Sequence, residues 1–284
     1  MQKLDSISAS KINTIKDCLG KFHYKYILKT NQVEILFVNT LIGLVIHSLM
    51  EESINMIRNG FKLKKINEFI ETNFESKYDS ILQLELSKNK VLYAKKGFKK
   101  PEAIKTGIKW TKEFLIFLNR YLLKYSKEFY TEKRFEFEYK NYLITGFIDF
   151  LSVNSKDEYH VLDFKTTSDL KKWYFVDFSS DIQSLFYSFA ILNEFKTSMK
   201  KFSYLILSKD DRIIFVNSEK ENRDEEEITK SFDKIIAIIE KAKEDSSNVK
   251  LYSPDETKCG FCSYSNICPS FKEGSFNFRK YLKI

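Results

Sequence analysis

The segment GFIDFLSVNSKDEYHVLDFKTTSDL, residues 146–170, decides the fold of this chain. It contains two apolar runs of strand length with turn-forming residues between them, which predicts two neighbouring strands. Asp149 lies in the first run, and Asp163 and Lys165 lie in the second. Because side chains alternate along a strand, Asp163 and Lys165 are expected on one face and Phe164 on the other. The segment therefore predicts two carboxylates and an ammonium group side by side.

The apolar periodicity on either side of this segment predicts an α/β fold with a mixed central sheet flanked by helices. Serines that can cap a helix precede the first helical pattern, and acidic residues begin the last one, as the helix dipole favours. We expect strands over 133–140, 142–154, 158–168, 201–208 and 212–219. We expect helices over 8–27, 38–60, 181–195 and 224–245, with helical periodicity through 61–130.

The composition favours one folded unit. The 284 residues include only 8 glycines and 3 prolines, which argues against long linkers and low-complexity disorder. We therefore expect residues 1–284 to form a single unit with a helical insertion over 60–130. A sheet core over 131–220 carries the two carboxylates, and a tail over 253–284 closes on Cys18.

The net charge is +8, and this basic excess favours a polyanionic partner, although a lysine-rich solvated surface is the alternative. The N-terminal residues lack the apolar core of a signal peptide, and the apolar run 35–50 is too short and too polar to span a bilayer. We therefore expect a cytoplasmic protein without a membrane segment. In that reducing environment the four cysteines are expected to be metal ligands or core residues rather than disulfides.

Two buried carboxylates on adjacent strands repel each other and lose hydration, and a divalent cation between them removes both penalties. Mg²⁺ and Mn²⁺ prefer such oxygen ligands. Lys165, on the face of Asp163, would orient a metal-bound water and stabilise negative charge on a phosphate. The alternative is a buried ion pair between Asp163 and Lys165 with no catalytic role.

Two further features accompany the carboxylates and the lysine. Gln183 and Tyr187 lie one turn apart on a predicted helix and so share one of its faces. His47 lies in an otherwise apolar helical pattern, where it is either a core residue or a further metal ligand. The chain order His, Gly-x-Ile-Asp, Asp-x-Lys, Gln-x-x-x-Tyr then becomes the strongest sequence signal.

This order resembles the PD-(D/E)xK nuclease superfamily in its RecB-like branch, which includes nuclease domains of bacterial helicase–nucleases and CRISPR-associated adaptation nucleases. The resemblance runs from about Ser8 to Pro269, and no motif covers 60–130. It implies a restriction-endonuclease-like core and a DNA substrate, with single-stranded ends preferred. It also implies metal binding by His47, Asp149, Asp163 and the Phe164 carbonyl, with Lys165, Gln183 and Tyr187 as catalytic residues beside Asp149 and Asp163.

Three of the four cysteines, Cys259, Cys262 and Cys268, crowd into one segment near the C-terminus, and Cys18 lies near the N-terminus. Four thiolates complete either a Cys₄ zinc site or a [4Fe–4S] cluster, and their number does not separate the two. Cysteines without a metal are the remaining alternative. The RecB-like branch has members with one cysteine ahead of the core and three behind it, and this resemblance implies a [4Fe–4S] cluster that joins the chain ends.

These features lead to the hypothesis of a Mg²⁺- or Mn²⁺-dependent deoxyribonuclease, a single-strand exonuclease of recombination, repair, phage replication or CRISPR adaptation. A structure-specific endonuclease and a nucleic-acid-binding subunit of a helicase–nuclease complex are the alternatives. The chain lacks the G-x-x-x-x-G-K-[ST] motif, so translocation would need a helicase or recombination partner. Segments 21–26, 95–100 and 171–175 combine lysines with aromatic residues and are candidate DNA contacts.

Overall fold

The computed structural model describes residues 5–94, 98–167, 170–174, 176–208, 213–218, 223–252 and 256–271. Its main sheet contains β1 (Asp5–Ile7), β4 (Ser126–Tyr139), β5 (Tyr142–Asn154), β6 (Tyr159–Thr167), β7 (Met199–Ser208) and β8 (Ile213–Asn217). A small second sheet pairs β2 (Glu34–Phe37) with β3 (Lys90–Tyr93). The longer helices are α1 (Ala9–Asp17), α3 (Val38–Arg58), α4 (Leu63–Ser87), α5 (Lys100–Tyr121), α6 (Ile182–Phe195) and α7 (Glu225–Asp245). Short helical turns are α2 (Leu19–Phe22), η1 (His23–Ile27), η2 (Leu123–Tyr125), η3 (Lys171–Trp173), η4 (Val249–Leu251) and α8 (Glu256–Cys259).

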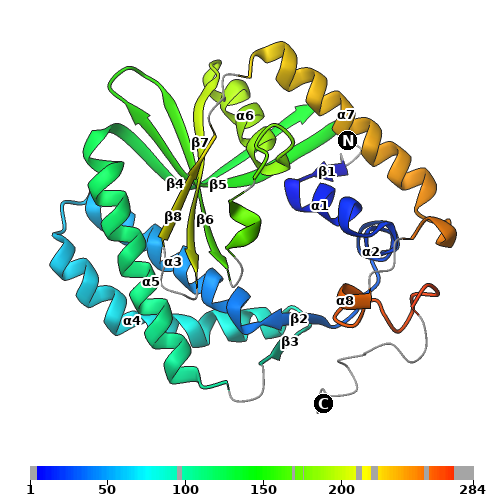
Figure 1. The fold of residues 1–284 in the computed structure, drawn as a ribbon, viewed down its shortest axis with the longest axis horizontal. Helices are drawn as coiled ribbons and strands as arrows, with labels where there is room; N and C mark the ends of the chain where they lie inside the picture. Colours follow the sequence, from blue (N-terminus) through cyan, green and yellow to red (C-terminus); the bar gives the residue numbers. More distant parts are fainter. Residues whose placement is uncertain are drawn as a thin grey trace.

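The predicted mixed sheet flanked by helices is confirmed (Figure 1). One core lies between the sheet and α3, α4 and α5, and it includes Phe150 and Phe164. A second core lies on the other side, where α1, α6 and α7 pack against the sheet. No helix in the described ranges is both long and apolar enough to cross a membrane.

The hairpin of β4 and β5 is the longest strand pair, and it follows the sequence prediction closely. Its two-residue turn, Lys140–Asn141, has positive φ at both positions, 46° and 66°, as the tight hairpin turns require. The pairing then runs without an inserted residue from Tyr139↔Tyr142 to Glu128↔Val153. The turn therefore fixes which residue of β4 faces each residue of β5.

The second edge of β5 is forked. β6 pairs with it only from Phe150 to Val153, and β1 pairs with it only over 142–144. Neither strand pairs with residues 145–149, which lie between those two contacts. β6 continues beyond Leu162 as the parallel partner of β7. The sheet therefore opens beside Asp149, at the point where the buried carboxylates lie.

Two expectations about elements are wrong. The helix expected over 8–27 breaks at Cys18, whose backbone is extended with φ −165°, so α1 ends at Asp17. The region 61–130 is not wholly helical, because it contains β3 and the start of β4. The turn expected between β7 and β8 falls at 209–211, outside the described residues.

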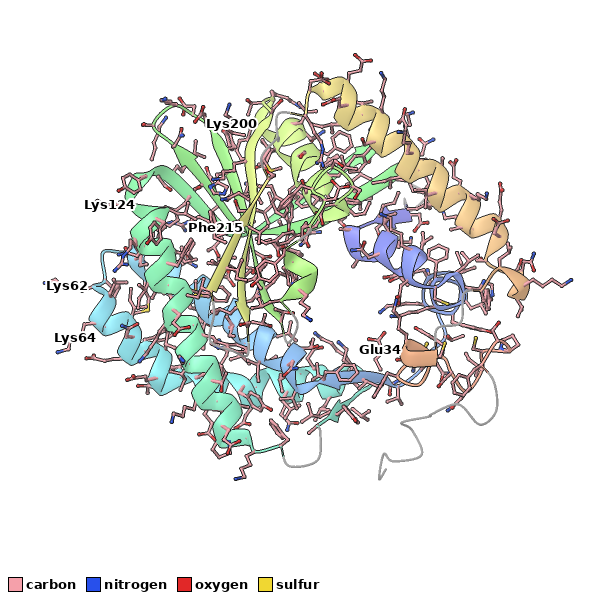
Figure 2. All side chains as sticks on the ribbon, in the orientation of Figure 1. Glu34, Lys62, Lys64, Lys124, Lys200 and Phe215 are labelled. Carbon is pink, nitrogen blue, oxygen red and sulfur yellow. The ribbon has the colours of Figure 1, made fainter. Side chains whose placement is uncertain are left out.

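The basic excess lies partly on the outer rim. Figure 2 shows Lys62, Lys64, Lys124 and Lys200 at the periphery of the molecule, and all four are exposed. The expected DNA-contact segment 21–26 is largely structural. Its Phe22 is fully buried, its Tyr24 stacks on Tyr264 and its Lys25 forms an ion pair with Glu34.

We predict that Gly107→Val lowers the free energy of unfolding by about 2–3 kcal/mol, because a well-packed core does not accept extra methyl groups. A Cβ at position 107 of α5 would lie 2.1 Å from Cζ of Phe74, which is fully buried in α4. Urea unfolding measures the change. Lys105→Val, at an exposed position of the same helix, is the control and should cost only a few tenths of a kcal/mol in helix propensity. Equal losses in both variants would contradict the packing argument.

Candidate active site

The fork positions Asp149 and the backbone of Phe164. Because β5 and β6 have diverged here, the N–H of Phe164 does not donate a hydrogen bond to a backbone carbonyl of β5. Oδ2 of Asp149 accepts its hydrogen bond instead, at 2.9 Å. The Asp149 residue is 8% exposed and Asp163 is fully buried. The Asp149 side chain thus takes the place of a backbone acceptor in the sheet. The Phe164 carbonyl on the same edge points toward α3.

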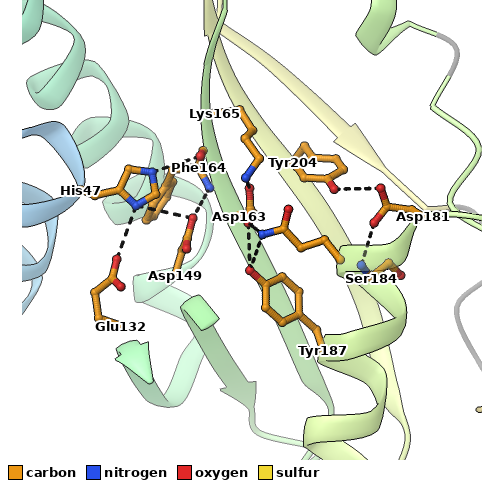
Figure 3. Close-up of polar contacts among 11 residues, drawn as sticks. His47, Glu132, Asp149, Asp163, Phe164, Lys165, Asp181, Ser184, Tyr187 and Tyr204 are labelled. Carbon is orange, nitrogen blue, oxygen red and sulfur yellow. Dashed lines mark hydrogen bonds and ion pairs between the residues drawn. The ribbon is translucent and has the colours of Figure 1, made fainter. Parts of the chain in front are cut away.

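His47 reaches this carbonyl from α3 (Figure 3). Its Nε2 lies 3.2 Å from the Phe164 oxygen, and its Nδ1 lies 3.7 Å from Oδ2 of Asp149. Three of the predicted metal ligands therefore converge: His47, Asp149 and the Phe164 carbonyl. The ligand atoms of His47, Asp149 and Glu132 lie within 4.8 Å of one another, which makes them the candidate metal group among the described residues.

Glu132 is a site residue that the sequence analysis missed. Its Oε1 lies 3.4 Å from Nδ1 of His47. It lies in β4, and the register on both sides of it (Thr131↔Phe150 and Lys133↔Ile148) places it opposite Asp149. Its φ of 46° is uncommon for a residue inside a strand. The sequence contains enough information to find Glu132. If residues are paired outward from the Lys140–Asn141 turn, Glu132 falls opposite Asp149.

Asp163 belongs to a second set of contacts. Lys165 forms an ion pair with its Oδ2, so these two side chains share a strand face as expected, and Phe164 packs in the opposite core. Tyr187 donates a hydrogen bond of 2.9 Å to Oδ1, and Gln183 donates to the same oxygen. Gln183 also donates to the Tyr187 hydroxyl at 2.7 Å. All the predicted side chains therefore gather at the fork, with Asp163 held toward Lys165 and α6.

The second set is supported by residues that the sequence analysis did not select. Asp181 caps the N-terminus of α6 by accepting from Ser184 N–H at 2.7 Å, which fixes the helix that presents Gln183 and Tyr187. The other oxygen of Asp181 accepts from Tyr204 at 3.0 Å. Tyr204 lies beside Asp163 in the β6–β7 register. Its ring centroid is 5.7 Å from the Lys165 Nζ.

The electrostatics of the site favour a bound cation. Burial raises the pKa of Asp149, and burial together with the Asp149 charge raises the pKa of Asp163 to about 6. Burial lowers the pKa of His47, but the Glu132 hydrogen bond and the Asp149 charge outweigh it and raise this pKa to about 9. The carboxylates and the Phe164 carbonyl supply the oxygen ligands that Mg²⁺ and Mn²⁺ prefer, and the His47 imidazole adds one nitrogen donor. The residues present therefore fit a divalent metal.

Two cavities adjoin these groups. The first, of about 730 Å³, is lined by His47, Glu132 and Lys165. The second, of about 650 Å³, is lined by Gln183 and Tyr187 and reaches the start of α1. His47 and Glu132 of the metal group therefore face the first cavity, and Gln183 and Tyr187 of α6 face the second.

We predict that Glu132→Gln lowers the pKa of His47 in the metal-free protein, because the Glu132 carboxylate is the strongest group that raises it. The folded-state pKa of about 9 exceeds the unfolded value near 6.5. The stability that His47 contributes is therefore present below pH 6.5 and is lost as the pH rises through 9. NMR titration of the imidazole measures the shift, and the variant should lose less stability over this range. An unchanged titration would contradict the contact between the two side chains.

The four cysteines lie in two segments, 17–24 and 258–268, that contact each other. Oδ1 of Asp17 accepts a 2.8 Å hydrogen bond from Lys258, and Tyr24 donates to the Ile267 carbonyl at 3.1 Å. Burial raises the pKa of both Cys262 and Cys268. The four thiols are half-buried, but they do not form a metal group at the spacing that the His47 group meets. The two cysteine-bearing segments are therefore in contact, but their thiols do not form a closed set of metal ligands.

The family model described as the PD-(D/E)XK nuclease superfamily matches residues 6–269. No curated protein matches the sequence. Among solved structures, the chain is similar to a Eubacterium rectale protein named "Putative exonuclease", at 11% identity and a TM-score of 0.48 over 86% of this chain and 82% of that one. It is also similar to SSO0001, at 18% identity and a TM-score of 0.35 over 89% of this chain and 95% of that one. Because the family match extends from β1 to the cysteine segment, the chain belongs to the PD-(D/E)XK nuclease superfamily.

Proposed function

We propose that this nuclease is a Mg²⁺- or Mn²⁺-dependent deoxyribonuclease that degrades single-stranded DNA from an end. The observation that carries the proposal is the convergence of His47, Asp149 and the Phe164 carbonyl beside the Asp163–Lys165 pair. We assign His47, Asp149, Asp163 and the Phe164 carbonyl as metal ligands. We include Glu132 in the metal site because it contacts His47. The metal would supply an activated water and neutralise charge on the phosphate.

Lys165 acts as a hydrogen-bond donor in this proposal. Burial lowers its pKa, but the neighbouring Asp163 and Asp149 charges outweigh burial and raise it. The amine therefore stays protonated near neutral pH and does not serve as a base. A fixed ammonium group can orient the attacking water and stabilise the negative charge that develops on the phosphate. Asp163 holds the ammonium, and Gln183 and Tyr187 hold Asp163.

The larger organisation is also a proposal. We regard residues 1–284 as one nuclease unit, with 60–130 as an insertion that is mostly helical, formed by α4 and α5 around β3, and 131–220 as the catalytic core. Cys18, Cys259, Cys262 and Cys268 would bind a [4Fe–4S] cluster, with zinc as the alternative occupant. The support is that contacts between 17–24 and 258–267 already bring the cysteine-bearing segments together. We also propose a cytoplasmic role with a helicase or recombination partner, for which the support is the resemblance of the motifs to the RecB-like branch.

Incubation with end-labelled single strands and Mg²⁺ or Mn²⁺ tests the proposal. We expect shortening of linear strands from one end and no cleavage of closed single-stranded circles. Cleavage of the circles would show an endonuclease. A mobility shift without cleavage under both metals would favour the DNA-binding subunit. Asp149→Ala should abolish cleavage and keep most DNA binding, since metal ligands serve the chemistry and basic side chains serve affinity.

A further inference from the structure

Phe147 is an exposed aromatic residue inside the active-site strand. It lies in the stretch of β5 that neither β1 nor β6 pairs with, two residues before Asp149. It is 55% exposed, whereas the following β5 residues Ile148, Phe150 and Leu151 are at most 1% exposed. Leaving a phenylalanine in water forgoes about 2 kcal/mol of burial free energy. The ring belongs to neither of the two hydrophobic cores of the described residues.

The position of Phe147 links it to the catalytic groups. It lines the first cavity together with His47 and Lys165. It also lines the second cavity together with Gln183 and Tyr187. The ring therefore stands at the boundary of the two cavities, beside both contact sets. A DNA strand whose phosphate reaches Lys165 brings a nucleobase close to this ring.

The neighbour of Phe147 across the hairpin is cationic. Arg134 of β4 is its register partner, and side chains in such pairs lie about 5 Å apart. The Arg134 side chain is 64% exposed and also lines the second cavity, where Glu136 pairs with it. An aromatic face for a base beside a cation for a phosphate is the combination that single-stranded nucleic acids bind. On the other side, the exposed Leu44 of α3 adds a further apolar surface to the first cavity.

We propose that Phe147 stacks on an unpaired nucleobase next to the phosphate held at Lys165, and that this contact selects single-stranded DNA. The inference rests on the proposed function and identifies the residue that sets its substrate class. Bases inside a duplex are covered on both faces by their neighbours, so they offer no face to a protein ring. An unpaired base offers one without the cost of unstacking.

DNA binding in a chelator tests the inference, because metal-dependent cleavage does not occur there. Fluorescence anisotropy with labelled single strands and with blunt duplexes of equal length gives two affinities for each variant. Phe147→Ala should weaken single-strand binding by about 5- to 100-fold, the range found for stacking on one base. Duplex binding should stay within about twofold of wild type. Phe147→Trp should keep the single-strand affinity, because its ring also stacks.

Tyr125→Ala is the matched control, since Tyr125 is 65% exposed but lines neither of the two cavities. Unchanged single-strand binding in Phe147→Ala, or equal losses for single strands and duplexes, would overturn the inference. Absence of cleavage by the wild-type protein with metal would instead overturn the proposed function, and the binding ratio would still decide the role of Phe147. Absence of all DNA binding would overturn both.

Discussion

Lys165→Ala is expected to slow DNA cleavage by about 10²- to 10³-fold, the loss typical when one donor that stabilises developing charge is removed. The ammonium of Lys165 is held by the fully buried Asp163 beside the metal group. The variant leaves the metal ligands in place, so single-strand binding should fall far less than the rate. Single-turnover cleavage of an end-labelled strand measures the rate, and anisotropy measures the binding.

Lys165→Arg should not restore the rate, because a planar guanidinium cannot occupy the place of a compact ammonium beside a bound water. Lys90→Ala is the matched control. Lys90 forms a comparable half-buried ion pair, with Glu85, but it lies in β3 and lines neither cavity of the site. Full activity in Lys165→Arg would favour a purely structural ion pair between positions 163 and 165.

Cys18→Ser is expected to give the largest loss of stability. If Cys18 completes a four-thiolate cluster, the serine variant loses iron and sulfide, because such a site binds metal only in the folded state and its binding energy adds to folding. A loss of about 3 kcal/mol would lower the melting temperature by about 6–12 °C. Proteolysis should increase near both chain ends. Iron, sulfide and zinc analysis of anaerobically purified protein, with a thermal melt, measures the effect.

Ser246→Ala is the control that distinguishes loss of a metal ligand from loss of a contact made by the N-terminal segment. Oγ of Ser246 lies 3.1 Å from Nδ1 of His23, so this variant weakens a contact between the N-terminal segment and the end of α7 without touching a thiol. Its metal content should equal that of wild type. Unchanged metal content in Cys18→Ser would rule out a four-cysteine site that includes Cys18. Stoichiometric zinc in wild type would rule out the iron–sulfur cluster but keep the four-cysteine site.

The sequence predicts those parts of the site that follow from strand periodicity. The alternation along residues 162–166 is enough to put Asp163 and Lys165 on one face, and the structure has them in contact. The Gln183 and Tyr187 pair follows from helical spacing in the same way. The local sequence pattern was sufficient in both cases, because the two contacting residues are at most four positions apart and lie in the same strand or helix.

Other features depend on contacts between distant segments. The fork exists because the three-residue β1 and the start of β6 share one edge of β5, and a strand as short as β1 leaves almost no periodic signal. Tyr204 supports the site only through the parallel register of β7 with β6. The break at Cys18 interrupts a helical pattern that is otherwise continuous over 8–27. At Cys18 tertiary structure therefore overrode local propensity.

The contacts between segment 17–24 and segment 246–267 have a consequence for how the protein folds. The contacts that join them span 223 residues from His23 to Ser246, 241 from Asp17 to Lys258 and 243 from Tyr24 to Ile267. Closing such loops is slow, whereas the β4–β5 hairpin needs only local chain motion. During synthesis the segment around Tyr24 leaves the ribosome long before its partners exist. Folding is therefore expected to proceed outward from the central hairpin, and the two ends meet last, after translation of the cysteine segment.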